Sequence, residues 1–94
     1  EELVLDVDEF LENESQVTLF PNPFSSELMI EKSSNQNLQY KIFDFLGRKI
    51  IEGNLENEIT QLELDTLADE IYLISFFSKD GEWLTNFKII KIKP

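Results

Sequence analysis

The sequence predicts an all-β fold, an immunoglobulin-like Greek-key β-sandwich of about seven short antiparallel strands. From Gln16 onward, apolar residues alternate with polar ones in short windows, which is the period of a half-buried strand. Turn residues separate these windows roughly every 10 residues, as they do in sandwiches. No helix longer than one turn is needed to connect them.

Composition narrows the range of functions. The 94 residues are enough for one small domain, and 41% apolar residues, including eight Phe, are enough to fill its core. Cysteine and histidine are both absent, which removes disulfides, the usual zinc ligands and the commonest general base. We therefore expect no enzyme, no cofactor, no metal and no small-molecule substrate.

The net charge of −11 is unevenly distributed, because residues 1–15 contain seven of the 19 acidic residues and no Lys or Arg. We interpret residues 1–15 as an acidic linker or flanking segment of a parent protein, compatible with a short strand or a helical turn, and residues 16–94 as the domain. An acidic chain is poorly suited to nucleic acid or an anionic membrane surface. No run approaches the roughly 20 apolar residues of a membrane span.

The first predicted strands flank a proline-rich turn. Residues 17–20 lead into Pro21-Asn22-Pro23, whose prolines fix φ and remove two hydrogen-bond donors, so we predict a turn there. Leu28 and Ile30 mark the inward face of the next strand. The polar residues 33–37 then predict a loop.

A hairpin is predicted in the middle of the chain. Leu38, Tyr40 and Ile42 share one face of a strand. Asp44-Phe45-Leu46-Gly47-Arg48 then reverses the chain into residues 49–52. Asp44 is expected to accept hydrogen bonds from turn amides, and Gly47 to take a positive φ.

The second half of the chain predicts a crossover and another hairpin. The apolar pattern of Ile59, Leu62, Leu64 and Leu67 predicts a short strand and then a tight crossover. A helix is not expected there, because Thr60, Asp65 and Thr66 weaken helical propensity. Residues 71–77 are the most strand-like window. Lys79-Asp80-Gly81-Glu82 predicts a turn built on Asp-Gly, and residues 83–92 return as the last strand.

Tyr72 has two interpretations. In Greek-key sandwiches, a Tyr just after the crossover between sheets buries its ring and donates its hydroxyl to an upstream carbonyl, which we predict for Tyr72. The alternative is an ordinary core aromatic that shares a face with Ile74 and Phe76.

Four motifs, taken in order, resemble a known family. They are Leu19-Phe20-Pro21-Asn22-Pro23, a central hairpin at residues 42–50, residues 62–67 followed by Ile71-Tyr72-Leu73-Ile74, and the terminal Phe87-Lys88-Ile89-Ile90-Lys91-Ile92-Lys93-Pro94. This order resembles the type A C-terminal sorting domain of cargo proteins exported by the type IX secretion system of Bacteroidetes. One position departs from the pattern, because Glu70 stands where the family has Gly, and this predicts a different or a strained turn.

The resemblance implies a role in secretion. Such domains are small immunoglobulin-like sandwiches at the C-terminus of a cargo that carries its own signal peptide. They pass through the periplasm and are recognised by the outer-membrane translocon. A sortase-like cysteine peptidase then commonly removes them, here by a cut within residues 1–16, and the cargo is released or attached to lipopolysaccharide. The implied final location is the cell surface or the medium, and the membrane is met only through the secretion machinery.

The candidate site residues follow from the motifs. Recognition by the translocon is predicted for Pro21, Asn22 and Pro23 and for the terminal strand, which consists of Phe87, Lys88, Ile89, Ile90, Lys91, Ile92 and Lys93. A strand at a sheet edge offers unpaired backbone groups for strand addition, and lysines limit casual pairing there. Alternatively, the prolines only end a strand, and Lys88, Lys91 and Lys93 only solvate an outer face. Asp44, Gly47 and Arg48 are predicted to shape the central turn, and Tyr72 and Gly81 to have structural roles.

Three other functions stay open at this point. A carbohydrate-binding or adhesion module would need a row of exposed aromatics, for which the candidates are Phe43, Phe45, Phe77 and Trp83. A calcium-stabilised spacer would use Asp6, Asp8 and Glu9, or Asp65, Asp69 and Glu70. A carboxylate pair for catalysis would be Glu63 and Asp65, although alternating acids usually form the wet face of a strand.

Overall fold

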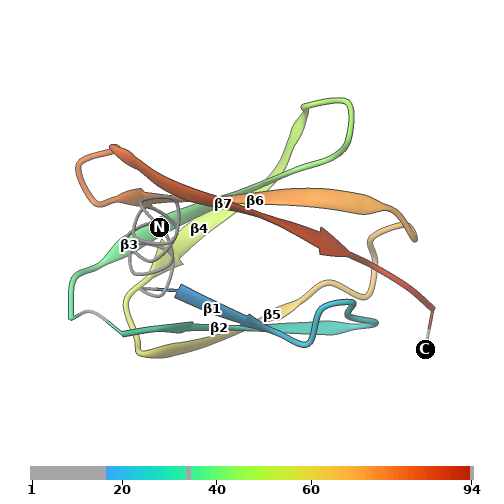
Figure 1. Ribbon diagram of the computed structural model, residues 1–94, viewed down its shortest axis with the longest axis horizontal. Helices are drawn as coiled ribbons and strands as arrows, with labels where there is room; N and C mark the ends of the chain where they lie inside the picture. The colour runs from blue at the N-terminus through green and yellow to red at the C-terminus, as the bar shows by residue number, and fades with distance from the viewer. Residues whose placement is uncertain (1–16, 34, 94) are drawn as a thin grey trace, which may run out of the picture.

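The computed structural model describes residues 17–33 and 35–93, and these form seven strands with no helix among them (Figure 1). The strands are β1 (Val17–Phe20), β2 (Glu27–Lys32), β3 (Leu38–Phe43), β4 (Lys49–Leu55), β5 (Ile59–Glu63), β6 (Ile71–Ser78) and β7 (Trp83–Ile90). All of their ladders are antiparallel. The predicted all-β class and strand number are confirmed. The described part of the chain has no helix long and apolar enough to cross a membrane.

The strands form two layers, which Figure 1 shows one above the other. A three-stranded sheet has the order β1-β2-β5, and a four-stranded sheet has the order β4-β3-β6-β7. The chain leaves the first sheet after β2, makes the β3–β4 hairpin in the second, returns for β5, and crosses again to β6 and β7. These crossings between sheets are typical of a sandwich with Greek-key connections.

The core lies between the layers and follows the predicted alternation. On β3, Leu38, Tyr40 and Ile42 are buried while the residues between them are half-buried. On β6, Tyr72, Ile74 and Phe76 are buried in the same way. The sequence period of two therefore placed these inward faces correctly, since side chains alternate across a pleated strand.

The candidate aromatic platform is divided by polar residues. Phe77 lies outward beneath Lys41, whose Nζ is 4.7 Å from the ring centroid, and Trp83 pairs with Phe77 across β6 and β7. Ser75, which is paired with Lys41 and with Asn86 of β7, separates these rings from Phe43. The four-stranded sheet therefore does not present the continuous row that an aromatic binding platform needs.

The two predicted glycine turns have the expected backbone. Gly47 has φ +86° and Gly81 has φ +96°, both in the region that favours glycine. Glu70 needs no such conformation, because no described residue other than glycine has a positive φ. The missing family glycine is therefore accommodated by a different turn rather than by a strained one.

Candidate functional site

Four segments that are far apart in the sequence lie on one side of the sandwich, on the right in Figure 1, where the β3–β4 hairpin rises above the other three. They are the turn after β1, the β3–β4 hairpin, the crossover into β6 and the end of β7. We call this the motif end, and define it as residues 21–24, 44–48, 64–72 and 88–93. It brings together every motif that carried the family resemblance, so it is the candidate site.

Residues 21–24 clasp the end of β7. The Asn22 side chain donates from Nδ2 to the Lys88 carbonyl (2.9 Å) and accepts at Oδ1 from the Ile90 amide (3.0 Å). The Phe24 amide donates to the Ile90 carbonyl, and the Ile92 amide donates to the Phe24 carbonyl, both at 2.9 Å. The Asn22 amide thus supplies a donor and an acceptor, as a neighbouring strand would, and Phe24 continues the pairing in parallel with Lys91.

This clasp, as we call residues 21–24, changes the sequence-based view of the terminal strand. β7 does lie at the edge of its sheet. Its outward-facing backbone groups from Lys88 to Ile92 are nevertheless occupied by Asn22 and Phe24. The expectation that this stretch offers unpaired groups for strand addition is therefore wrong. The interpretation of the prolines as simple strand terminators is incomplete, because Pro21 and Pro23 flank the residue that holds β7.

Phe24 anchors the clasp, although the sequence pattern does not predict this role. Its side chain is only 1% exposed and belongs to the core cluster. Phe24 follows the Pro-Asn-Pro turn directly and lies between two predicted strands. The sequence does not alternate between apolar and polar residues there, so its burial could not be predicted from the pattern. An aromatic residue in an otherwise polar turn was the available signal.

The terminal residues divide into buried and exposed groups. Ile89 is fully buried, and Phe87 is half-buried with its ring edge-on to Phe76, at 6.0 Å between centroids. Lys91 is buried as well. The residues exposed to a partner are Lys88, Ile92 and Lys93.

Lys91 is held inside the motif end. Its Nζ lies 3.5 Å from Asp69 Oδ1, and its amide donates to the Glu70 carbonyl at 3.0 Å. A buried ammonium group needs such a partner, because an unpaired charge is costly away from water. Solvation of an outer face is therefore the wrong interpretation for Lys91, although Lys88 and Lys93 are exposed.

Tyr72 closes the crossover at this end. It is buried, and its hydroxyl donates to the Ala68 carbonyl at 2.7 Å, which is the geometry of a tyrosine corner. Burial raises the pKa of Tyr72, and the nearby carboxylates of Glu70 and Asp44 add to this effect. The hydroxyl therefore keeps its proton and its role as a donor.

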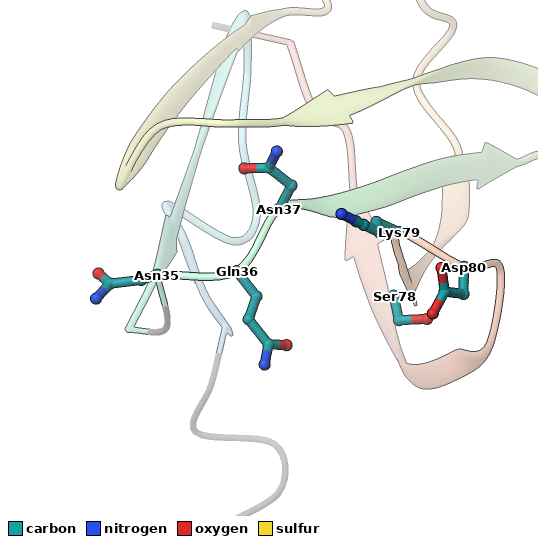
Figure 2. A pocket seen from close by; sticks show the side chains of 6 residues that line it. All are labelled: Asn35, Gln36, Asn37, Ser78, Lys79 and Asp80. Atoms are coloured by element: carbon teal, nitrogen blue, oxygen red, sulfur yellow. The ribbon is translucent and has the colours of Figure 1, made fainter.

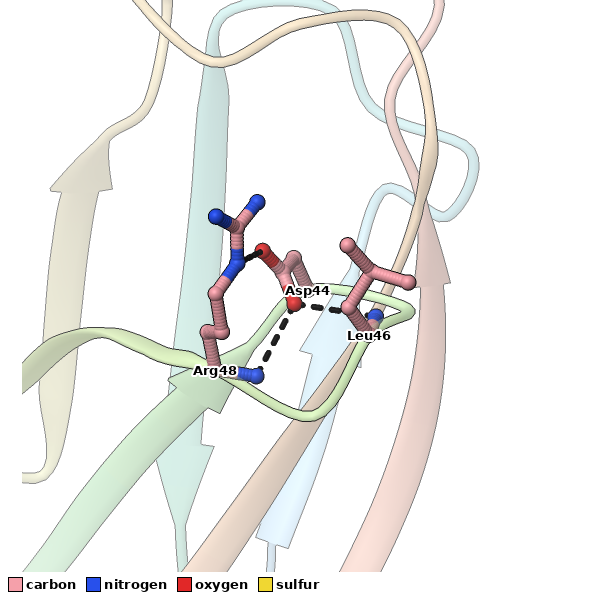
Figure 3. A network of polar contacts seen from close by, with 3 residues as sticks. All are labelled: Asp44, Leu46 and Arg48. Carbon is pink, nitrogen blue, oxygen red and sulfur yellow. Dashed lines mark hydrogen bonds and ion pairs between the residues drawn. The ribbon is translucent and has the colours of Figure 1, made fainter.

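The β3–β4 hairpin is shaped by one carboxylate (Figure 3). Asp44 Oδ1 accepts from the amides of Leu46 (3.0 Å) and Arg48 (2.9 Å), and Oδ2 accepts from Arg48 Nε (2.8 Å). The hydrogen bond from the Arg48 amide, together with the adjacent guanidinium, lowers the pKa of Asp44. Asp44, Gly47 and Arg48 thus have the turn-shaping positions that the sequence predicts.

The opposite end of the sandwich carries a hollow whose polar side chains do not converge on a common point (Figure 2). It is lined by Asn35, Gln36, Asn37, Ser78, Lys79 and Asp80. In Figure 2 the three amide side chains point in different directions rather than toward one point. We call residues 35–37 and 78–82 the loop end.

The proposed calcium ligands are not assembled. Asp69 is paired with Lys91. Residues 17–33 and 35–93 contain no group of three or more acidic, His or Cys residues that could hold a metal ion, and Asp65 and Glu70 therefore belong to no such group. The other triad, Asp6, Asp8 and Glu9, lies outside the described residues. Of the candidate catalytic pair, Glu63 is exposed and accepts from Gln61 Nε2 at 2.6 Å.

Comparisons with known proteins agree with this geometry. A family model described as the secretion system C-terminal sorting domain matches residues 18–92. A solved structure from Bacteroides vulgatus, a DUF3244 family protein with an immunoglobulin-like β-sandwich fold, is similar with a TM-score of 0.64 and 16% identity, over 81% of this chain and 86% of that one. At that identity the likeness supports the fold alone. No curated protein sequence matches. Because the family match spans nearly the whole described chain, this protein belongs to the C-terminal sorting domains of type IX secretion.

Proposed function

We propose that this domain directs a cargo protein, fused N-terminal to it, through the type IX translocon across the outer membrane. Family membership over residues 18–92 carries this proposal, since the family consists of secretion sorting domains. The cargo passes through the periplasm and reaches the cell surface or the medium. A sortase-like cysteine peptidase then removes the domain by a cut within residues 1–16, which lie outside the described residues.

The translocon recognises the folded motif end. Two elements that we predict to take part in recognition, the Pro-Asn-Pro turn and the terminal strand, are joined by the clasp. A partner therefore meets them as one surface, with Lys88, Ile92 and Lys93 exposed beside the clasp. Strand addition along Lys88–Ile92 would first require the displacement of Asn22 and Phe24, whereas recognition of the clasped surface requires no rearrangement.

The test is export of a periplasm-targeted fluorescent reporter that carries residues 1–94 at its C-terminus. In a Bacteroidetes host with an intact type IX translocon, we expect fluorescence at the cell surface or in the medium. In a translocon mutant, we expect the reporter to stay in the periplasm. Retention of a folded reporter in both hosts would contradict the proposal.

Truncation is a poor control, because removing residues 88–94 also removes Ile89 from the core and Lys91 from its ion pair. Such a chain is expected to unfold. Substitutions at exposed positions separate recognition from folding. Each variant is therefore compared with wild type by thermal unfolding before its export is measured.

A further inference from the structure

The tip of the β3–β4 hairpin exposes two large apolar side chains. Phe45 is 69% exposed and Leu46 is 65% exposed, the highest values among the large apolar residues that the structure describes. In Figure 1 this hairpin projects beyond the sandwich at the motif end. Exposed apolar groups that cluster on one feature typically mark an interaction site. We call Phe45 and Leu46 the tip pair.

The turn beneath the tip pair is held rigid by its polar groups. The Asp44 carboxylate accepts three hydrogen bonds within the turn, from Leu46 and Arg48. The Asp44 amide donates to the Arg48 carbonyl, and the Gly47 amide donates to the Asp44 carbonyl, both at 2.9 Å. A turn with so many internal bonds presents its apolar side chains in a fixed arrangement, so little conformational entropy is lost on binding.

The apolar surface continues from the tip onto the outer face of the four-stranded sheet. Phe43, just before the turn, is paired with Leu73 of β6, and both side chains face outward. Leu73 and its neighbour on the same face, Ile71, are 39% and 49% exposed. The tip pair is therefore the outermost part of a larger apolar area, which suits it to entering a pocket on a partner.

Charge favours a protein partner over a lipid surface. The two cations next to the tip are both paired: Arg48 lies 2.8 Å from Asp44, and Lys49 lies 3.0 Å from Glu52. The domain at residues 16–94 carries 12 acidic and eight basic side chains, a net charge of −4. An anionic membrane would repel such a domain, whereas an apolar pocket on a protein needs no cationic partner.

We infer that the tip pair inserts into an apolar pocket on the same export protein that receives the clasped terminal strand. This inference rests on the proposed function. Figure 1 shows the hairpin and the end of β7 on the same, right-hand side of the sandwich, although β4 and β7 are the two opposite edges of their sheet, so a partner that contacts both must span this side. The tip pair then acts as a second, apolar contact beside the polar one made through Lys88 and Lys93.

The test uses the full-length chain on the fluorescent reporter. The double variant Phe45→Ser/Leu46→Ser is expected to lower export about tenfold or more, because two apolar side chains no longer enter the pocket. The matched controls are Ile59→Ser and Trp83→Ser, which change residues that are 49% and 59% exposed outside the motif end. They are expected to export like wild type, and all variants to keep the wild-type melting temperature.

A second pair of measurements keeps the inference falsifiable if the serine variant is unstable. Phe45→Met/Leu46→Met keeps the apolar character and is expected to export like wild type. The wild-type chain, produced in the periplasm without a reporter, is expected to compete with reporter export. The serine variant is expected to compete at least tenfold less well.

The outcomes separate the two proposals. If the wild-type chain and the serine variant are exported equally well, the proposed contact of the tip pair is overturned, and the sorting function is left intact. Failure of the wild-type chain to be exported by an intact translocon would overturn the sorting function itself. Flotation of the chain with phosphatidylglycerol vesicles, if lost in the serine variant, would overturn the protein pocket in favour of a membrane.

Discussion

The two ends of this sandwich are built differently. At the motif end, Asn22 reaches Lys88 and Ile90, which are 66 and 68 positions away in the chain, and a buried Lys91 is paired with Asp69. At the loop end, Gln39 Nε2 donates to the Lys79 carbonyl at 3.3 Å, and the Glu82 amide donates to Ser78 Oγ at 3.1 Å, both at exposed positions. The motif end thus combines bonds between distant segments with a buried lysine, whereas these side-chain bonds of the loop end are exposed.

This difference bears on what a sorting signal is. If the terminal strand were a free edge, it would act as a short peptide that a partner completes. Instead, the clasp covers its edge and Ile89 is buried in the core. The terminal strand is therefore part of a folded surface, whose integrity depends on residues near the start of the domain.

The largest expected effect comes from removing the anchor of the clasp. Phe24→Ala deletes one of the largest fully buried side chains, and we expect it to lower the free energy of unfolding by about 3–5 kcal/mol. Trp83→Ala, which removes a larger but exposed ring, is expected to cost less than about 1 kcal/mol. Urea unfolding of the two variants measures both values. Equal losses would contradict the role of Phe24 as the buried anchor of the clasp.

Removing the Asn22 side chain tests the clasp more selectively. Asn22→Ala loses two exposed hydrogen bonds and is expected to cost about 1–2 kcal/mol. The Ile90 amide is then expected to exchange with solvent about tenfold faster, as measured by NMR. Gln39→Ala, the matched change, removes a side-chain hydrogen bond to Lys79 of the loop end and is expected to leave that exchange rate unchanged. An unchanged Ile90 rate in Asn22→Ala would argue against the clasp.

The tyrosine corner gives a smaller effect. Tyr72→Phe removes only the hydroxyl that donates to Ala68, and is expected to cost about 1 kcal/mol. Tyr40→Phe is the control, because Tyr40 is also a buried aromatic residue of the core but does not lie at the crossover. A larger loss in Tyr40→Phe than in Tyr72→Phe, measured by thermal unfolding, would contradict the special role of the corner.

The smallest expected effect is the contribution of the Asp44 turn to the pH dependence of stability. Because the folded state lowers the pKa of Asp44, its contribution is fully present at neutral pH and is lost as the pH falls below about 4. Asp44→Asn is therefore expected to be less stable than wild type at pH 7, and the gap is expected to narrow toward pH 2. Thermal unfolding across this range measures the gap. A constant gap would mean that the charge of Asp44 plays no part.

Much of the fold could be predicted from the sequence, because the relevant signals are local. Alternation placed the inward faces of β3 and β6, and Asp44 with Gly47 specified the turn of the β3–β4 hairpin. The clasp could not be predicted in this way, since its bonds join residues that only the completed sandwich brings together. Local periodicity contains no information on such pairs.

The burial of Lys91 was not predicted for a different reason. Lys91 follows Phe87 and Ile89 at the same period of two, so the pattern itself placed it on the inward face. The general preference of lysine for the surface outweighed that pattern in the sequence analysis. Burial is tolerated here because Asp69 on the crossover supplies the opposite charge.

We propose that the motif end, rather than the loop end, is recognised during export. The most direct test compares two single charge reversals in the reporter, Lys88→Glu at the motif end and Lys79→Glu at the loop end, both at exposed positions. With both variants folded, we predict that Lys88→Glu lowers export about tenfold or more, and that Lys79→Glu exports like wild type. Equal export of the two variants would contradict the claim.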